Sequence, residues 1–186
     1  MGRSLGTVRT FERTELQAAT DSLTGLMHRR TLENRLQAML AGRQPFALAM
    51  ADLDHFKRLN DTHGHAAGDR ALRLFAHTIS NGIRDGDLFA RYGGEEFVLV
   101  FPHLSVQEAA EAIDRLRTLL AGAVGSTAAP AMTAGLGVAD STAGTTLDEI
   151  LRAADGALLQ AKALGRDRVV VAGEHHPELE ELPTRS

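Results

Sequence analysis

The sequence contains no cysteine, and this absence removes two classes of structure at once. Neither a disulfide framework nor a thiolate metal site can form among its 186 residues. Long apolar runs are also missing, because the longest, residues 46–51, has the length of a strand rather than of a membrane span. The N-terminus lacks the apolar core of a signal peptide. We therefore expect a cytoplasmic protein with no membrane contact from this segment.

The chain also lacks a strong excess of either charge. Lys and Arg number 20 against 24 Asp and Glu, which gives a formal net charge of −4. This balance argues against bulk attraction to a nucleic acid polymer or an anionic membrane. Any phosphate ligand must then be held by a few placed cations or by a metal. A hydrophobic fraction of 44% in 186 residues fits one globular domain with short tails.

Hydrophobic periodicity divides the chain into alternating helices and strands. Helices are predicted over residues 28–40, 68–83, 105–120 and 146–164, and strands over 46–53, 88–92, 96–101, 132–138 and 169–171. The strand at 46–53 is apolar on both faces, which is typical of a central strand covered by helices on each side. We expect an α/β (α+β) fold with a central mixed five-stranded sheet flanked by helices.

The two ends are expected to differ from the domain between them, residues 21–172. Residues 1–20 carry an irregular helical stripe and are predicted to form a linker or stalk helix, with a frayed leader helix as the alternative. Residues 173–186 are acidic and polar with two prolines, and we expect them to be disordered.

The most informative segment places two glycines and two carboxylates between apolar strands. Gly93 and Gly94 are followed directly by Glu95 and Glu96. A two-residue Gly-Gly connection suits a hairpin with a primed turn, in which glycine adopts positive φ values. Without side chains, the glycines would also let a ligand approach the backbone. Acids beside a bare backbone indicate a metal and phosphate, and a solvated surface turn is the alternative.

A further acid lies where the predicted strand 46–53 ends. Asp52 prolongs an apolar strand face, so it either lies in solvent or binds a cation, because burying it unpaired would cost several kcal/mol. Glu95 offers a second oxygen ligand from the hairpin. One or two carboxylates, completed by water and substrate phosphates, commonly hold Mg²⁺.

Several motifs in this order carry a family resemblance. The two longest are Arg91-Tyr92-Gly93-Gly94-Glu95-Glu96-Phe97 and Asp52-Leu53-Asp54-His55-Phe56-Lys57-Arg58-Leu59-Asn60-Asp61. They resemble the signatures of GGDEF-domain diguanylate cyclases, here in the GGEEF form. The likeness spans about residues 21–172, from Asp21-Ser22-Leu23-Thr24-Gly25-Leu26 to Gln160-Ala161-Lys162-Ala163-Leu164-Gly165-Arg166. Two positions depart from the common pattern, since His28 and Asp167 each stand where Asn is usual.

The resemblance implies a nucleotide cyclase fold related to polymerase palms. It further implies that two GTP-loaded domains meet as a homodimer and make cyclic di-GMP and pyrophosphate. Asp52, the Leu53 carbonyl and Glu95 would hold two Mg²⁺ ions, for which Mn²⁺ could substitute. Either Glu95 or Glu96 would accept the proton of the attacking hydroxyl. Because a bound cation lowers a carboxylate pKa, a ligand role is favoured for Glu95. A sensory domain is expected before this segment in the full-length protein.

The resemblance also assigns residues to the triphosphate. Lys57, in the loop after strand 46–53, would contact phosphate oxygens together with the N–H groups of His55 and Phe56. Lys162 and Arg166 would clamp the triphosphate from the other side, near the bare backbone of Gly93 and Gly94. The alternatives are a solvated surface lysine for Lys57, and cations attracted to a helix C-terminus for Lys162 and Arg166.

Base choice is assigned to Asn60, His65 and Asp69, which match the guanine-side positions of the family. Guanine offers N1–H and N2–H₂ donors, and a carboxylate at Asp69 can accept both. Adenine presents a different pattern that would leave the carboxylate oxygens poorly paired. We therefore expect GTP as the substrate rather than ATP. The alternative for Asp69 is an acid that complements the N-terminus of the following helix.

Arg84 and Asp87 fit the Arg-x-x-Asp pattern that precedes the hairpin in family members subject to product inhibition. Five residues, Leu88 to Tyr92, separate Asp87 from Gly93, as in the family. Arg84 can bind phosphate or guanine with two hydrogen bonds, and Asp87 can accept from guanine. Arg115, on the next predicted helix, is a candidate second arginine. The alternative function is a catalytically silent domain that binds cyclic di-GMP here as a receptor.

Overall fold

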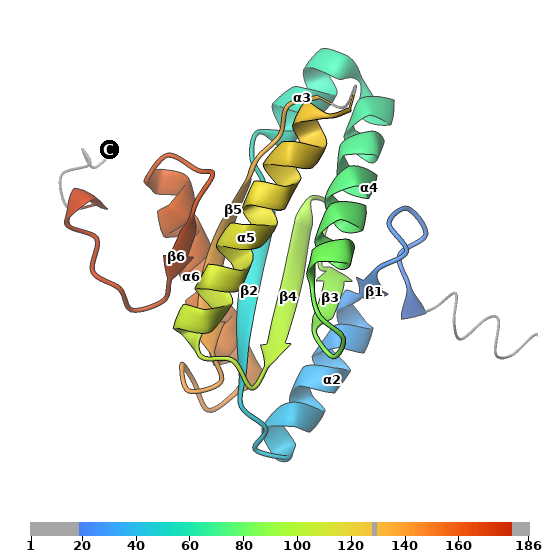
Figure 1. Cartoon of the computed structure of the whole chain (residues 1–186). Helices are drawn as coiled ribbons and strands as arrows, with labels where there is room; N and C mark the ends of the chain where they lie inside the picture. Colours follow the sequence, from blue (N-terminus) through green and yellow to red (C-terminus); the bar gives the residue numbers. More distant parts are fainter. Residues whose placement is uncertain (1–18, 128–129, 180–186) are drawn as a thin grey trace, which may run out of the picture.

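Helices and strands alternate around one mixed sheet (Figure 1). This computed structural model describes residues 19–127 and 130–179, so most of the predicted stalk (1–20) and the last seven residues of the predicted tail (173–186) lie outside it. The strands are β1 (Met27–His28), β2 (Phe46–Leu53), β3 (Leu88–Arg91), β4 (Glu96–Pro102), β5 (Ala134–Asp140) and β6 (Val169–Val171). The helices are α2 (Arg29–Ala41), α3 (Phe56–His63), α4 (His65–Gly82), α5 (Val106–Gly125) and α6 (Leu147–Ala163), followed by the 3₁₀ turn η1 (Pro177–Leu179).

The sheet has the strand order β1-β3-β4-β2-β5-β6. β2 is antiparallel to both β4 and β5, β3 is antiparallel to β4, and the two outer strands β1 and β6 run parallel to their neighbours. The predicted mixed sheet is confirmed, with six strands instead of five. The additional strand is β1, whose two residues are too few for a periodic pattern and include His28, assigned above to a helix.

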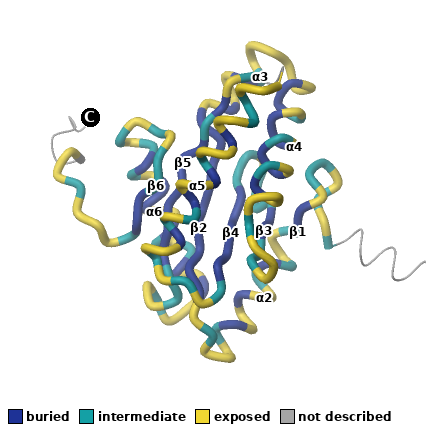
Figure 2. The backbone as a smooth tube through the Cα atoms, viewed as in Figure 1, coloured by how far each residue is buried: buried dark blue, intermediate teal, exposed yellow. Residues whose placement is uncertain are grey.

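Two helical layers cover the sheet, with α4 and α5 on one face and α2 and α6 on the other (Figure 1). Every residue of β2 is buried, as the continuous dark blue of this strand in Figure 2 shows. Ala47 and Ala49 pack with Phe75 of α4, whereas Leu48 packs in a second cluster with Ile150 of α6. The prediction of a central strand that is apolar on both faces is therefore confirmed.

Helix α6 approaches the sheet more closely than a side chain on β5 would allow. A Cβ atom at Gly137 would lie 2.1 Å from both the Ala154 carbonyl oxygen and the Leu158 nitrogen. Thr146 begins the helix with a capping box, in which Glu149 takes part, close to the predicted start. This packing fixes the C-terminal end of α6, which carries Lys162, beside the end of β2.

Apart from shifts of one residue, four elements differ from the predictions. α3 occupies the region after β2 that was predicted as a loop, α4 begins at His65, α5 extends to Gly125, and β5 is displaced toward Asp140. α3 has eight residues and only two buried apolar ones, Phe56 and Leu59, too few to show a helical period. None of the helices in residues 19–127 and 130–179 combines the length and apolar character needed to cross a lipid bilayer.

Candidate active site

The end of β2 and the β3–β4 hairpin meet at one edge of the sheet. Asp52 pairs in register with Glu96 across β2 and β4, and the Leu53 N–H donates to the Glu95 carbonyl oxygen at 3.3 Å. From the neighbouring helix, Lys162 places its Nζ 3.1 Å from Asp52 Oδ2. We use the term catalytic edge for the surface formed by Asp52, Glu95, Lys162 and Arg166.

The two carboxylates of the catalytic edge are only partly compensated. Asp52 is 9% exposed, and burial raises the pKa of its carboxyl; Lys162 opposes this shift, while Asp54 adds to it. Burial likewise raises the pKa of Glu95, and the negative charges of Asp52 and Glu96 raise it further. A raised carboxyl pKa means that negative charge is disfavoured there. The catalytic edge therefore favours an added cation.

The donor set fits a metal that is shared with a substrate. Within residues 19–127 and 130–179, no group of three or more His, Cys, Asp or Glu side chains could hold a metal ion by itself. Asp52 and Glu95 supply two hard carboxylates, and the Leu53 carbonyl is a third oxygen at the same edge. Mg²⁺ usually keeps several waters and takes its remaining ligands from substrate phosphates. These residues thus fit Mg²⁺ bound together with a polyphosphate.

The hairpin tip differs from the predicted two-residue turn. The N–H groups of Tyr92 and Gly93 both donate to the Glu96 carbonyl oxygen, at 2.8 and 3.2 Å, so the connection comprises residues 93–95. Neither Gly93 nor Gly94 has a positive φ, and the primed-turn prediction is wrong. A Cβ at Gly93 would lie 2.4 Å from Glu96 Oε2, so the end of the Glu96 side chain would have to move to admit one. A Cβ at Gly94 would have nothing within 4 Å, which leaves this backbone open to a ligand.

Arg91 holds the hairpin tip to the start of the domain. Its Nε and Nη2 donate to the Gly94 carbonyl oxygen at 3.1 and 2.6 Å, and its Nη1 lies 3.1 Å from both carboxylate oxygens of Asp21. Sequence reasoning noted both residues only as parts of motifs. A contact between residues 70 positions apart leaves no signal in local periodicity, so their pairing could not be predicted.

The residues assigned to phosphate after β2 lie on a helix rather than in a loop. His55 has a left-handed backbone with φ of 57°, and α3 begins at the next residue. Lys57 is exposed in the first turn of α3, which corrects its predicted location. Among the described residues, no side chain caps this helix start. The first N–H groups of α3 are therefore open to an anion.

The residues assigned to the base lie on two consecutive helices. Asn60 is on α3, and His65 and Asp69 are on the first turns of α4. Asn60 Oδ1 is buried and has no hydrogen-bond partner among the described residues. It lies against Gly68, where a Cβ would come within 1.9 Å of it. A buried acceptor left unpaired costs about 1–3 kcal/mol, and such groups are found at ligand sites. Sequence reasoning missed the requirement for glycine at position 68.

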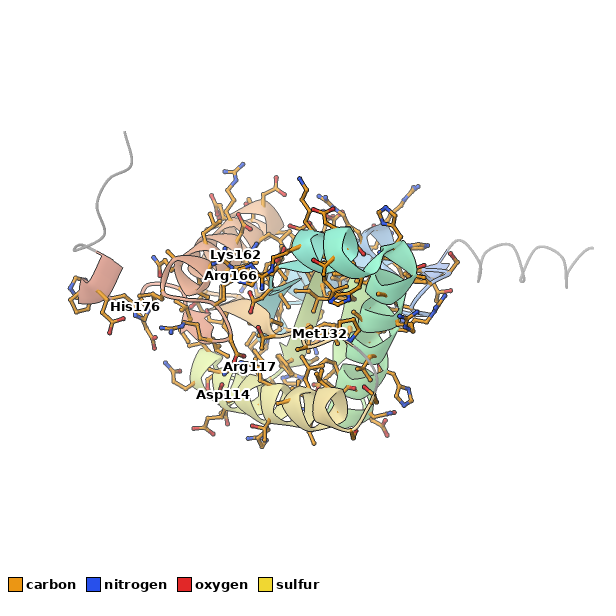
Figure 3. All side chains as sticks on the ribbon, turned by 90° about the horizontal axis from the view of Figure 1, so that it is seen from above. Asp114, Arg117, Met132, Lys162, Arg166 and His176 are labelled. Atoms are coloured by element: carbon orange, nitrogen blue, oxygen red, sulfur yellow. The ribbon has the colours of Figure 1, made fainter. Side chains whose placement is uncertain are left out.

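Lys162 and Arg166 reach the catalytic edge from the end of α6 (Figure 3). Lys162 lies in the last turn of the helix and is paired with Asp52. Arg166 lies near enough to Asp52 to lower the pKa of that carboxyl, against the larger effect of burial. Gly165 and Arg166 have φ values of 113° and 65°, so the chain reverses direction directly after the helix. Both cations of the predicted clamp thus lie beside Asp52.

Arg84, Asp87 and Arg115 line one groove of about 630 Å³ between the end of α4 and α5, here named the Arg84 groove. Arg84 Nε lies 3.0 Å from Asp87 Oδ1, and its Nη2 donates to the Pro102 carbonyl oxygen at 2.7 Å. The Asp87 side chain is only 4% exposed. The fold thus brings Arg115 to the same groove as the Arg-x-x-Asp pair.

Comparison with known proteins identifies the family. Residues 18–168 match the family described as diguanylate cyclase, GGDEF domain. The chain belongs to this family. The GGDEF domain therefore includes the catalytic edge, the hairpin and the Arg84 groove.

Relatives of this GGDEF domain include characterised and solved proteins. Diguanylate cyclase VdcA of Vibrio cholerae is 37% identical over 163 residues, which cover 82% of this chain and 47% of VdcA. The GGDEF and coiled-coil structure of DgcB from Caulobacter crescentus, in complex with c-di-GMP, matches with a TM-score of 0.82 and 30% identity, covering 89% of this chain and 92% of that one. Diguanylate cyclase SiaD of Pseudomonas aeruginosa, solved with its activator SiaC, matches with a TM-score of 0.76 and 37% identity, covering 89% and 67%. The expected cyclase fold is confirmed by these structures.

This chain spans only part of the curated relatives that it matches. It covers 47% of VdcA and 24% of diguanylate cyclase DgcP from Pseudomonas aeruginosa. The likeness therefore concerns the GGDEF domain.

Proposed function

We propose that two copies of this GGDEF domain condense two molecules of GTP into cyclic di-GMP and release two pyrophosphates. The observation that carries this proposal is the catalytic edge, where two incompletely compensated carboxylates lie near two cations, Lys162 in the last turn of α6 and Arg166 in the turn after it. Such an arrangement suits a substrate that brings both a metal and negative phosphates. The proposal is supported by VdcA and SiaD, which are named diguanylate cyclases, and by the c-di-GMP complex of DgcB.

Asp52, the Leu53 carbonyl and Glu95 would hold Mg²⁺ at the catalytic edge, with Mn²⁺ as a substitute. Two bound ions would neutralise charge on the triphosphate and lower the pKa of the attacking hydroxyl. The protein's own part is to keep two carboxylates close together despite their repulsion, which costs stability until a cation arrives.

The triphosphate would be held by cations and by the start of α3. Lys162 would exchange its contact with Asp52 for a phosphate oxygen once Asp52 binds the metal. Arg166 would approach the phosphates from the same side. Lys57 and the N–H groups of His55 and Phe56 would contact them from the helix start, where the dipole favours negative charge.

In the reaction, the 3′-oxygen of each GTP bonds to the α-phosphorus of the other. The bond from that phosphorus to the bridging oxygen of the leaving pyrophosphate breaks. The hydroxyl proton passes to Glu95 or Glu96. A ligand role for Glu95 makes Glu96 the alternative acceptor, because a bound cation lowers the carboxylate pKa. Because each domain holds one GTP, the reaction requires a homodimer with two catalytic edges face to face.

Asn60, His65 and Asp69 would select guanine over adenine. The unpaired Asn60 Oδ1 is a buried acceptor that a base donor could satisfy. Asp69 follows Gly68 directly and could accept from guanine N1–H and N2–H₂.

The Arg84 groove would bind the product and inhibit the enzyme. Arg84 and Asp87 can contact phosphate and guanine, and Arg115 lies in the same groove. The same groove supports a second candidate function, a receptor that binds cyclic di-GMP without turnover. The two functions are distinguished by product formation at the catalytic edge.

The whole protein would carry a sensory domain before this segment, since the curated relatives are longer than this chain. An activator protein is a further proposed class of partner, because SiaD was solved with SiaC. We propose the cytoplasm as the location, because GTP is available there.

The test is to incubate the whole chain with GTP and Mg²⁺ over a range of protein concentrations and to identify the product by mass spectrometry. We expect cyclic di-GMP, with a rate per domain that rises with protein concentration because two domains must meet. Binding of cyclic di-GMP without any product at high protein concentration would contradict the cyclase and support the receptor.

A further inference from the structure

Arg117 joins α5 to the turn that follows α6. Its Nη1 donates to Asp114 Oδ1 at 2.7 Å on its own helix. Its Nη2 donates to the side chain of Asp167, with Oδ1 at 2.7 Å, and also to the Asp167 carbonyl oxygen. The Arg117 side chain is only 23% exposed. Figure 3 shows Arg117 and Asp114 on α5, with Arg166 at the end of α6. One guanidinium therefore connects elements that are 50 residues apart.

The turn held by Arg117 has an unfavourable backbone. Gly165, Arg166 and Asp167 have consecutive positive φ values of 113°, 65° and 44°. A non-glycine residue in this conformation is strained, and the surrounding contacts must hold it in place. A turn of this kind depends on its contacts more than an ordinary one does.

A second contact fixes the same turn from the sheet. The Asp167 N–H donates to Asp54 Oδ2 at 2.9 Å, and Thr133 Oγ1 donates to the same oxygen at 2.7 Å. Asp54 is 6% exposed and follows Asp52 by two residues at the end of β2. Asp167 is thus held between β2 on one side and α5 on the other.

The residue placed by this turn is Arg166. Its own N–H donates to the Ala161 carbonyl oxygen at 2.9 Å, and the next residue is the doubly held Asp167. This contact places Arg166 against the last turn of α6, next to Lys162, whose Nζ lies 3.1 Å from Asp52 Oδ2 (Figure 3), whereas Arg117 contacts Asp167. Arg117 is thus connected to the catalytic edge through the turn.

We propose that Arg117 is a positioning residue for the triphosphate. By holding Asp167, it keeps the Gly165–Asp167 turn left-handed, so that Arg166 faces the carboxylates of the catalytic edge. The inference rests on the proposed function, in that the phosphates bound there belong to GTP. Asp167 stands where the family usually has Asn, so the contact with Arg117 is an ion pair in this chain.

The experiment measures binding of a non-hydrolysable GTP analogue with Mg²⁺ by calorimetry, together with the KM and kcat for GTP. Arg117→Ala should weaken analogue binding and raise KM by about tenfold, because a displaced cation loses its charge-assisted contact. The kcat should stay within about twofold, since Arg117 touches no reacting atom. Asp114→Ala, which removes only the exposed partner on α5, is the matched control and should bind the analogue like the wild type.

Two further variants separate positioning from folding. Asp167→Asn keeps an acceptor oxygen for Arg117 and should retain affinity within about twofold. Arg166→Ala should weaken analogue binding, and the double variant Arg117→Ala/Arg166→Ala should bind no more weakly than Arg166→Ala alone. The proposal would be overturned if the losses of analogue affinity in the two single variants multiply in the double variant. It would also be overturned if Arg117→Ala binds the analogue like the wild type. A lower melting temperature of Arg117→Ala with unchanged binding would likewise mean a structural role only.

The outcomes distinguish this proposal from the proposed function. If the wild type binds the analogue but forms no cyclic di-GMP, the cyclase function is contradicted. The effect of Arg117→Ala on analogue binding then still tests the role of Arg117. A wild type that forms product while Arg117→Ala binds normally contradicts only the role of Arg117. Failure of the wild type to bind the analogue contradicts both.

Discussion

At the catalytic edge two carboxylates are only partly compensated by the nearby cations, whereas in the Arg84 groove the arginine and the aspartate neutralise each other. The pKa values of Asp52 and Glu95 are raised mainly by burial, and Lys162 only partly compensates them. Arg84 instead holds Asp87 and the Pro102 carbonyl oxygen with three hydrogen bonds: two, from its backbone N–H and Nε, to the Asp87 carboxylate, and one, from Nη2, to Pro102.

This difference indicates what each site requires before it can bind. At the catalytic edge the two carboxylates stay only partly compensated, so this site should gain stability when a cation and phosphate bind together. The Arg84 groove has its charges paired already, so a ligand must replace the contacts between Arg84 and Asp87 with contacts of its own. We therefore expect metal dependence at the first site and a purely organic ligand at the second. The predictions below begin with the largest expected effect.

Asp52→Asn should abolish most of the activity at the catalytic edge. Loss of one carboxylate weakens metal and triphosphate binding in the transition state, and the rate of cyclic di-GMP formation should fall by at least about 100-fold. Chromatographic quantification of the product checks this. Asp155→Asn, the same change at an exposed position of α6, is the control and should keep the wild-type rate. A wild-type rate for Asp52→Asn would contradict the assignment of Asp52 to the active site.

Arg84→Ala should weaken inhibition by cyclic di-GMP and leave the rate of the uninhibited reaction nearly unchanged. The concentration of cyclic di-GMP that halves the rate should rise by about tenfold or more, because a bidentate contact is lost. The uninhibited rate should remain within about twofold of the wild type. Arg73→Ala, at an exposed position of α4, should show the wild-type response. If both variants respond alike, the Arg84 groove is not the inhibitory site.

Asp69→Ser should relax the base preference. A hydroxyl cannot accept both guanine donors as a carboxylate can, so the ratio of kcat/KM for GTP over ATP should fall by about tenfold. Asp155→Ser provides the same substitution away from the base. An unchanged GTP to ATP ratio in Asp69→Ser would contradict the assignment of this residue to guanine.

Glu95→Gln should slightly raise the stability of the metal-free protein, in contrast to the losses of function expected above. Because the pKa of Glu95 is raised above its ordinary value of 4.5, the native state binds more protons than the unfolded state between these two values. Native stability therefore falls as the pH rises through that interval. Without metal at pH 7, Glu95→Gln should melt about 2 °C higher than the wild type, and the gap should close below about pH 4. A lower melting temperature at pH 7 would mean that the Glu95 charge is already compensated.

The layered fold could be predicted because its central strand has a strong pattern. β2 is apolar on both faces, and the amphipathic helices on either side follow a clear helical period. α3 could not be recognised, because its eight residues include only two buried apolar ones. The hairpin was recognised, but its turn was not, since neither Gly93 nor Gly94 adopts the positive φ on which the primed-turn prediction rested.

Site residues could be predicted where they belong to a sequence motif. They could not be predicted where their role depends on a contact between distant elements. Asp52, Glu95 and Lys162 were named from the sequence, and the structure places them together. The contacts of Arg91 with Asp21, of Asn60 with Gly68, and of Arg117 with Asp167 could not be named. Each depends on packing of separate elements, and neither residue type nor local spacing specifies such a pair.

The most direct test of the account compares the wild type with Glu95→Gln, each supplied with GTP and Mg²⁺ at high protein concentration. We expect cyclic di-GMP and two pyrophosphates for each product molecule from the wild type, and neither from Glu95→Gln. Equal product from both proteins would contradict the role of the catalytic edge. Absence of product from a wild type that binds cyclic di-GMP would contradict the cyclase itself.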